Sequence, residues 1–319
     1  MKGMFVMKGT KNKILKMAVL TAGTLHVINK IIDSNAITKM TFKAGGKIYH
    51  WKQGDIYYRV SGEGEPILLI HDLDPVSSSY EWTKIEKALA KKYTVYCIDL
   101  LGCGKSDKPP ILYTNYIYVQ LITDFVKEVI GEPARVATSG LSCSFVLMAN
   151  HANKSLFYDI SMISPEHPGK LKIYPDQKSK MLLWFFQIPI VGTFAYNMIM
   201  TKMNIEYQIT EKFFYNPFQV NDSMIKAFYD ASHTQNGKGK YLFASLESNY
   251  LNVDVINAVK SAQNKIHIII GEKTVNYDEV IQAYRKINHN ISAEIIHNAK
   301  KLPQLETPEE VLNALKEKN

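Results

Sequence analysis

Ser142 is the residue of this sequence that is best placed to act as a nucleophile. It lies in the run Gly-Leu-Ser-Cys-Ser, directly after an apolar stretch. A nucleophile on a strained strand-to-helix turn needs small residues two positions before it and two positions after it, because larger side chains would collide with the neighbouring chain. Gly140 and Ser144 meet this need around Ser142, whereas Ser139 would place Leu141 at a small position. The spacing predicts that Ser142 attacks a carbonyl carbon; an N-cap of the following helix is the alternative role.

Short apolar strands alternate with helical stretches through most of the chain. PILLIHD at 66–72 is almost entirely apolar, which is typical of a strand buried on both faces of a parallel sheet. The alternation predicts an α/β fold with a mainly parallel, twisted sheet and helices on both faces. We expect strands at residues 47–53, 55–62, 66–72, 93–100, 134–140, 159–165, 265–271 and 293–297.

The alternation stops after the sixth strand. Residues 166–238 are rich in aromatic residues and methionine, and we interpret them as a helical lid inserted into a core formed by residues 47–165 and 239–319. The apolar run at 181–200 is long enough to span a bilayer by count alone, but Pro189 and Gly192 interrupt it. We therefore expect a lid whose apolar face lines a pocket for an acyl or other apolar group.

Four segments resemble, in the right order, the motifs of the α/β-hydrolase fold family. They are HDLDPVSSSYEW at 71–82 for the oxyanion strand and loop, DLLGCGKSDKP at 99–109, GLSCS at 140–144 for the nucleophile elbow, and KLPQLETPEE at 301–310 for the histidine loop. The resemblance covers residues 47–319 and implies an α/β-hydrolase fold of the esterase or lipase-like branch with a lid.

By position, the resemblance also implies the remaining site residues. The backbone N–H groups of Leu73 and Cys143 would form the oxyanion hole. The positions of the family's acid and histidine are occupied by Thr274 and Lys301. Threonine carries no negative charge and a solvated lysine is a weak base, so the catalytic triad is degenerate.

Three residues of the sequence could replace the missing acid and base. Glu166 follows the sixth strand, at an acid position that some members of the family use; a solvated charge at the lid entry is the alternative. His297 lies four residues before Lys301 and reaches the site only if the loop folds back. Lys301 could itself form a Ser–Lys pair if burial lowered its pKa.

Two functions follow from this reading. The first is a serine hydrolase of esterase or lipase type that acts on a small apolar ester with reduced or altered catalysis. The alternative is a catalytically inactive hydrolase-like protein that binds an apolar ligand or a partner. Phosphate-binding and dinucleotide-binding glycine motifs and the His-Glu-x-x-His zinc motif are absent from the sequence, so we expect no cofactor and no metal.

The positive charge of the chain is concentrated at the N-terminus. Residues 1–32 carry six lysines and no acidic residue, and so supply +6 of the formal net charge of +8. The nearly neutral remainder does not indicate a nucleic-acid partner. We expect residues 1–35 to contact a membrane, which leaves the body cytoplasmic; a helix docked on a cytoplasmic protein is the alternative. The three cysteines, with no Cys-x-x-Cys pair, indicate reduced thiols.

Overall fold

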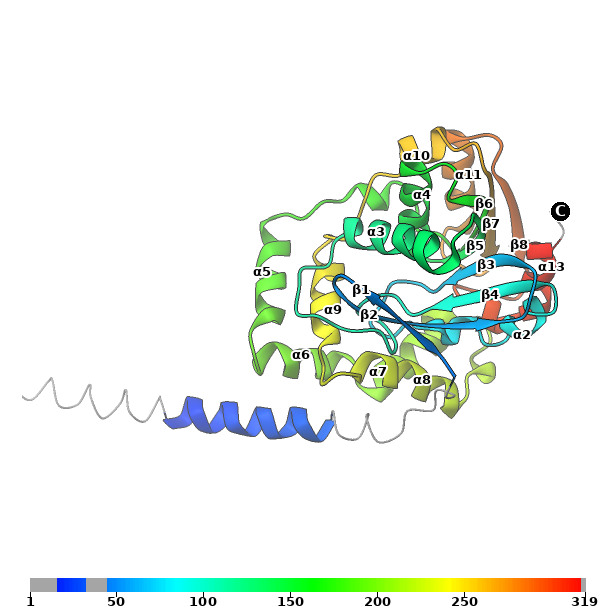
Figure 1. Cartoon of the computed structure of the whole chain (residues 1–319). Helices are drawn as coiled ribbons and strands as arrows, with labels where there is room; N and C mark the ends of the chain where they lie inside the picture. Colours follow the sequence, from blue (N-terminus) through cyan, green and yellow to red (C-terminus); the bar gives the residue numbers. More distant parts are fainter. Residues whose placement is uncertain (1–15, 33–44, 317–319) are drawn as a thin grey trace, which may run out of the picture.

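The structure, a computed structural model, describes residues 16–32 and 45–316. Within these residues, eight strands form one sheet in the order β1-β2-β4-β3-β5-β6-β7-β8 (Figure 1). The pairs β1–β2 and β2–β4 are antiparallel, and all the other neighbours are parallel. The strands are β1 (Lys47–Trp51), β2 (Gly54–Ser61), β3 (Glu65–Ile70), β4 (Tyr93–Ile98), β5 (Ala134–Ser139), β6 (Phe157–Ile163), β7 (Lys265–Gly271) and β8 (Ser292–Ile296). The mainly parallel sheet is confirmed, and each strand end lies within two residues of its predicted position.

Helices cover both faces of the sheet, as predicted. Leu68 and Ile70 of β3 point into one apolar cluster while Ile67 and Leu69 point into another, which is the two-residue period of a strand buried on both sides. The first cluster lies under α3 (Asn115–Phe125), η2 (Val126–Ile130), α4 (Ser142–Ala152), α10 (Ile256–Lys260) and α11 (Tyr277–Ile287). The second lies under η1 (Ser79–Trp82), α2 (Glu86–Leu89) and α13 (Pro308–Lys316).

A run of helices separates β6 from the second part of the sheet, where the sequence predicts the lid. In chain order these are η3 (Lys170–Lys172), α5 (Gln177–Gln187), α6 (Val191–Ile199), α7 (Lys202–Tyr207), η4 (Gln208–Phe213), η5 (Pro217–Gln219) and α8 (Asp222–His233), followed by α9 (Gly239–Glu247). A third apolar cluster joins them to α12 (Pro303–Glu306) through Leu302 and Leu305. We call α5, α6 and α7 the lid helices.

Within residues 16–32 and 45–316, no single helix is both long enough and apolar enough to cross a membrane. By length and composition, α5 and α6 could cross a membrane only as a pair, and they are bent by 102° relative to each other.

A separate helix covers residues 16–32 and docks on the lid (Figure 1). Its one buried side chain is Asn29, whose amide donates to the Ile190 carbonyl at 3.1 Å and accepts from Asn197 at 3.1 Å. The other parts of the predicted N-terminal segment, residues 1–15 and 33–35, lie outside the described residues.

Candidate functional site

The sharp turn between β5 and α4 is centred on Gly140. Its φ of +55° lies in the left-handed region that favours glycine. A Cβ atom at this position would lie 2.1 Å from the Asp72 carboxyl carbon, so no side chain fits there. In an elbow the nucleophile occupies the strained residue at the end of the strand. Gly140 therefore holds the position from which a nucleophile would project, and it carries no side chain.

Ser142 lies two residues beyond this turn, which corrects the prediction from the sequence. It is the first residue of α4, is fully buried, and its hydroxyl has no hydrogen-bond partner among the described residues. The small-residue rule also fits Gly140, because the small residues Thr138 and Ser142 stand two positions before and after it. The spacing of small residues therefore fits Gly140 as well as Ser142, and the left-handed φ value selects Gly140.

The Asp72 carboxylate accepts hydrogen bonds from two backbone N–H groups beside the turn at Gly140. Its Oδ1 accepts from the N–H of Leu73 and from the N–H of Leu141, each at 2.8 Å. An oxyanion hole is built from the N–H after the elbow residue and an N–H of the loop after β3. The Leu73 N–H, which the sequence predicts as an oxyanion-hole donor, is one of the two groups that donate to Asp72. Cys143 is not the other, because its N–H donates to the Gly140 carbonyl within the turn at 3.3 Å.

Lys301 holds the Asp72 carboxylate from the opposite side. Its Nζ lies 2.7 Å from Asp72 Oδ2, and its ammonium lies over the Phe213 ring. Burial opposes the charged form of both groups, but the Lys301 ammonium and the two N–H donors lower the pKa of Asp72 below its usual value. In the same way, burial is outweighed by the Asp72 carboxylate, which raises the pKa of Lys301 above its usual range. The Lys301 amine is therefore protonated at neutral pH, and the prediction of a base with a lowered pKa is wrong.

Two further carboxyl groups lie close to this ion pair. Glu81 accepts the N–H of Asp72 at 3.1 Å, and burial, followed by the Asp72 charge, raises the pKa of Glu81 to about 8. Burial likewise raises the pKa of Asp74 to about 6. Glu81 is therefore mainly a neutral acid at pH 7, since a second buried charge beside Asp72 would be repelled.

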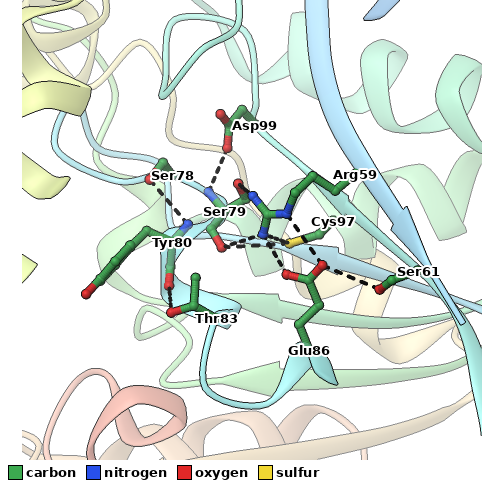
Figure 2. Close-up of polar contacts among 9 residues, drawn as sticks. All are labelled: Arg59, Ser61, Ser78, Ser79, Tyr80, Thr83, Glu86, Cys97 and Asp99. Carbon is green, nitrogen blue, oxygen red and sulfur yellow. Dashed lines mark hydrogen bonds and ion pairs between the residues drawn. The ribbon is translucent and has the colours of Figure 1, made fainter. Parts of the chain in front are cut away.

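The loop that carries Asp72 and Leu73 is fixed by a polar network at its far end (Figure 2). Asp99 accepts the Ser79 N–H at 2.7 Å, and Arg59 donates to the Ser79 hydroxyl at 2.8 Å and to Glu86 at 2.6 Å. At the near end the buried His71 accepts the Leu100 N–H at 3.0 Å, so His71 has a structural role. These contacts hold the loop in the position in which the Leu73 N–H donates to Asp72.

The other predicted site residues do not form a triad. His297 pairs with Glu272 at 2.8 Å and its side chain is 73% exposed, so it does not fold back toward Ser142. Glu166 lies near Lys301 but pairs with Lys170 at 2.8 Å. The hydroxyl of Thr274 has no hydrogen-bond partner among the described residues.

Two adjoining cavities open at this end of the sheet. One of about 360 Å³ is lined by Asp72, Leu141 and Lys301, together with Leu73, Asp74, Glu166, Lys170, Leu171, Ile173, Leu246, Glu247, Asn249 and Asn252. A second, of about 690 Å³, shares Glu166, Lys170 and Lys301 with it and also reaches Thr274. Neither is lined by Ser142, and both mix charged side chains with apolar ones. In residues 16–32 and 45–316, His, Cys, Asp and Glu side chains nowhere cluster in a group that could hold a metal ion.

Known proteins with this architecture are numerous among solved structures. The carbazole-degradation serine hydrolase CarC superposes with a TM-score of 0.68 at 19% identity, over 85% of this chain and 96% of that one. The carboxylesterase CesB (YbfK) from Bacillus subtilis gives a TM-score of 0.66 at 17% identity, over 93% and 100%. The chain has the α/β-hydrolase fold. A family model described as alpha/beta hydrolase fold also matches its residues 62–134.

The sequence similarity within this fold is local. A 2-hydroxy-6-oxo-6-(2'-aminophenyl)hexa-2,4-dienoic acid hydrolase from Metapseudomonas resinovorans is 37% identical over 71 residues, which are 22% of this chain and 24% of the relative. The aligned part thus spans about a quarter of the length of that curated relative. The family match ends at residue 134, before the turn at Gly140, the lid helices and Lys301. The α/β-hydrolase fold and its likeness to hydrolases are therefore established, while the chemistry of the site has to be argued from its own residues.

Proposed function

We propose that this chain is a non-hydrolytic protein of the α/β-hydrolase fold, which binds a small molecule in the cavity beside Asp72 and Lys301. One observation carries the proposal: the Asp72 carboxylate accepts the N–H groups of Leu73 and Leu141 and is neutralised by Lys301. A carboxylate in this place keeps a developing substrate oxyanion away from both donors, because the donors are taken and the charges are alike.

The residues at the positions of the nucleophile, the base and the acid also favour a protein that does not hydrolyse esters. Gly140 supplies no nucleophile at the turn, and Lys301 is held as a cation by its partner, so it cannot accept a proton near neutral pH. Thr274 provides no negative charge to orient a base. The alternative, a serine hydrolase acting on an apolar ester, would need the buried Ser142 hydroxyl to reach a cavity that other residues line. The printed names of the relatives favour hydrolysis, but their similarity to this chain does not extend to the turn.

The lining of the cavity of about 360 Å³ favours a ligand with both polar and apolar parts. Leu141, Leu171 and Ile173 offer apolar contact, and Glu247 with Asn252 offers polar contact. Pockets for small molecules combine mostly apolar walls with a few placed polar groups. A molecule with an apolar body and one polar end fits this lining better than the small apolar ester expected from the sequence.

Labelling with a fluorophosphonate probe and turnover of p-nitrophenyl esters test the absence of hydrolysis. We expect no labelling and no turnover above that of the Ser142→Ala variant, because the hydroxyl is buried away from the cavities. Labelling of the wild-type chain that is lost in Ser142→Ala would overturn the proposal.

Binding is tested separately by a thermal-shift screen with small amphipathic molecules. Ile173→Trp should abolish the shift caused by a hit, because Ile173 lines the cavity and is 53% exposed, so a larger side chain can be accommodated. Ile48→Trp is the matched control, since Ile48 is similarly exposed on β1 and lines neither cavity. A shift that survives in Ile173→Trp would place binding elsewhere.

A further inference from the structure

Large apolar side chains are exposed both on helix 16–32 and on the lid helices. Met17 and Leu20 on the first helix, Met181 and Trp184 on α5, and Met203 on α7 are each about two-thirds exposed or more. We call these five side chains the lid surface. A folded chain rarely leaves so many large apolar groups in water on neighbouring elements unless something covers them.

Helix 16–32 is attached to the lid helices, so its exposed apolar side chains are part of the surface of the folded chain. Asn29 fixes the helix to the Ile190 carbonyl and to Asn197 of α6, and Leu25 and Ile28 beside it are partly covered. Residues 16–20, at the other end, are all exposed. Figure 1 shows the helix, in blue, running below α6 and projecting past it. The helix therefore adds exposed apolar side chains to those of the lid helices.

The charges around the lid surface indicate what covers it. Residues 16–32 and 177–207 contain five lysines (Lys16, Lys30, Lys178, Lys180 and Lys202) and one acidic residue, Glu206, while Asp222 of α8 pairs with Lys202 at 3.5 Å. Lysines beside exposed Trp, Met and Leu are typical of elements that lie in the interface of an anionic bilayer. A second copy of this chain would instead bring the same lysines against each other across a symmetric interface.

We infer that the lid surface binds an anionic lipid bilayer, with helix 16–32, α5 and α7 lying in the headgroup region. The apolar side chains enter the boundary of the acyl chains, and the lysines contact the lipid phosphates. This inference is independent of the proposed function, because none of the five side chains of the lid surface lines either cavity.

Trp184 provides a direct test. Of the three tryptophans, Trp51 and Trp82 are buried, so only Trp184 can change its solvent exposure on binding. We expect the full chain to float with vesicles of phosphatidylcholine and phosphatidylglycerol, its emission to shift to the blue, and brominated lipids to quench it. Pure phosphatidylcholine or 0.5 M salt should weaken binding.

Variants separate the lid surface from attachment through the N-terminus alone. Met181→Ser with Met203→Ser keeps Trp184 as the reporter and should weaken vesicle binding by about tenfold, because two large apolar groups are lost. Tyr158→Ser with Val275→Ser is the matched control, since both side chains are exposed outside the lid helices, and it should bind as the wild type. The inference fails if the wild type does not float, if it floats without a change in Trp184 emission, if the control weakens equally, or if sedimentation shows a dimer that the double variant dissociates.

Discussion

The Asp72 carboxylate and a substrate oxyanion would compete for the same two donors, the N–H groups of Leu73 and Leu141. The carboxylate is tethered to the loop and already paired with Lys301, so it holds the site without the entropic cost of bringing in a free ligand. An ester substrate has no such advantage. In the proposed function, this single side chain would remove the stabilisation of the transition state, and Lys301 is its counter-ion.

Asp72→Ala should expose an anion site formed by the same two donors and Lys301. The variant leaves a largely buried ammonium without its partner, and we expect a loss of about 3 kcal/mol in the free energy of unfolding. Acetate should restore part of this loss, because its carboxylate fits where the side chain was. Urea unfolding with and without acetate measures the effect; Asp74→Ala is the control that acetate should not rescue. Equal effects of acetate on both variants would contradict the assignment.

Glu81 should make stability fall as the pH rises. Its folded pKa is about 8, whereas the unfolded side chain loses its proton near the usual glutamate value of about 4.3. The folded state therefore holds more protons between these values, and the free energy of unfolding decreases from pH 5 to pH 8 by about 4 kcal/mol at most. Glu81→Gln removes this titration, so its urea unfolding should depend less on pH over that interval. The same slope in variant and wild type would show that Glu81 is ionised in the folded chain.

At the level of elements, the turn from β5 to α4 sets where chemistry could occur. The strand ends at Ser139, the chain reverses at Gly140 and the helix begins at Ser142. The loop after β3 meets this turn because the parallel pairing of β3 with β5 brings their carboxyl ends together. The polar network around Arg59 and Asp99 then keeps the loop in place.

Gly140→Ala should destabilise the chain by about 3 kcal/mol or more, because its Cβ would overlap the Asp72 carboxyl group and the positive φ would be strained. Gly131→Ala is the matched control: Gly131 also has a positive φ, of +83°, but nothing lies within 4 Å of the added Cβ. It should lose only about 1 kcal/mol. Chemical unfolding of both variants measures the difference. Equal losses at the two glycines would argue against the close approach of Asp72.

At the level of the whole molecule, the sheet and the lid helices form one body on which helix 16–32 is an addition. Asn29 is the one buried side chain of that helix. The helix therefore contributes exposed apolar area to the lid surface while it contributes little to the core.

Deletion of residues 1–35 should leave the thermal unfolding midpoint within about 2 °C of the full chain, because Asn29 is the one buried side chain of the described part of this segment, residues 16–32. The truncated chain should still show a shift in Trp184 emission with anionic vesicles, at weaker affinity. Calorimetry and vesicle titration measure the two effects. A large fall in the midpoint would mean that the helix is part of the folding core.

The sequence by itself determined the order of strands and helices, the insertion after the sixth strand, and the unusual residues Thr274 and Lys301, because strand periodicity and motif order are local properties. The position of the turn was not determined, since small residues flank both Ser142 and Gly140, and only the backbone conformation separates them. The ion pair of Asp72 with Lys301 was also decided by the tertiary structure. It joins two loops far apart in the chain, and burial together with two N–H donors sets its charge state. Such a long-range contact leaves no periodic signal in the sequence, whereas the elements that create it do.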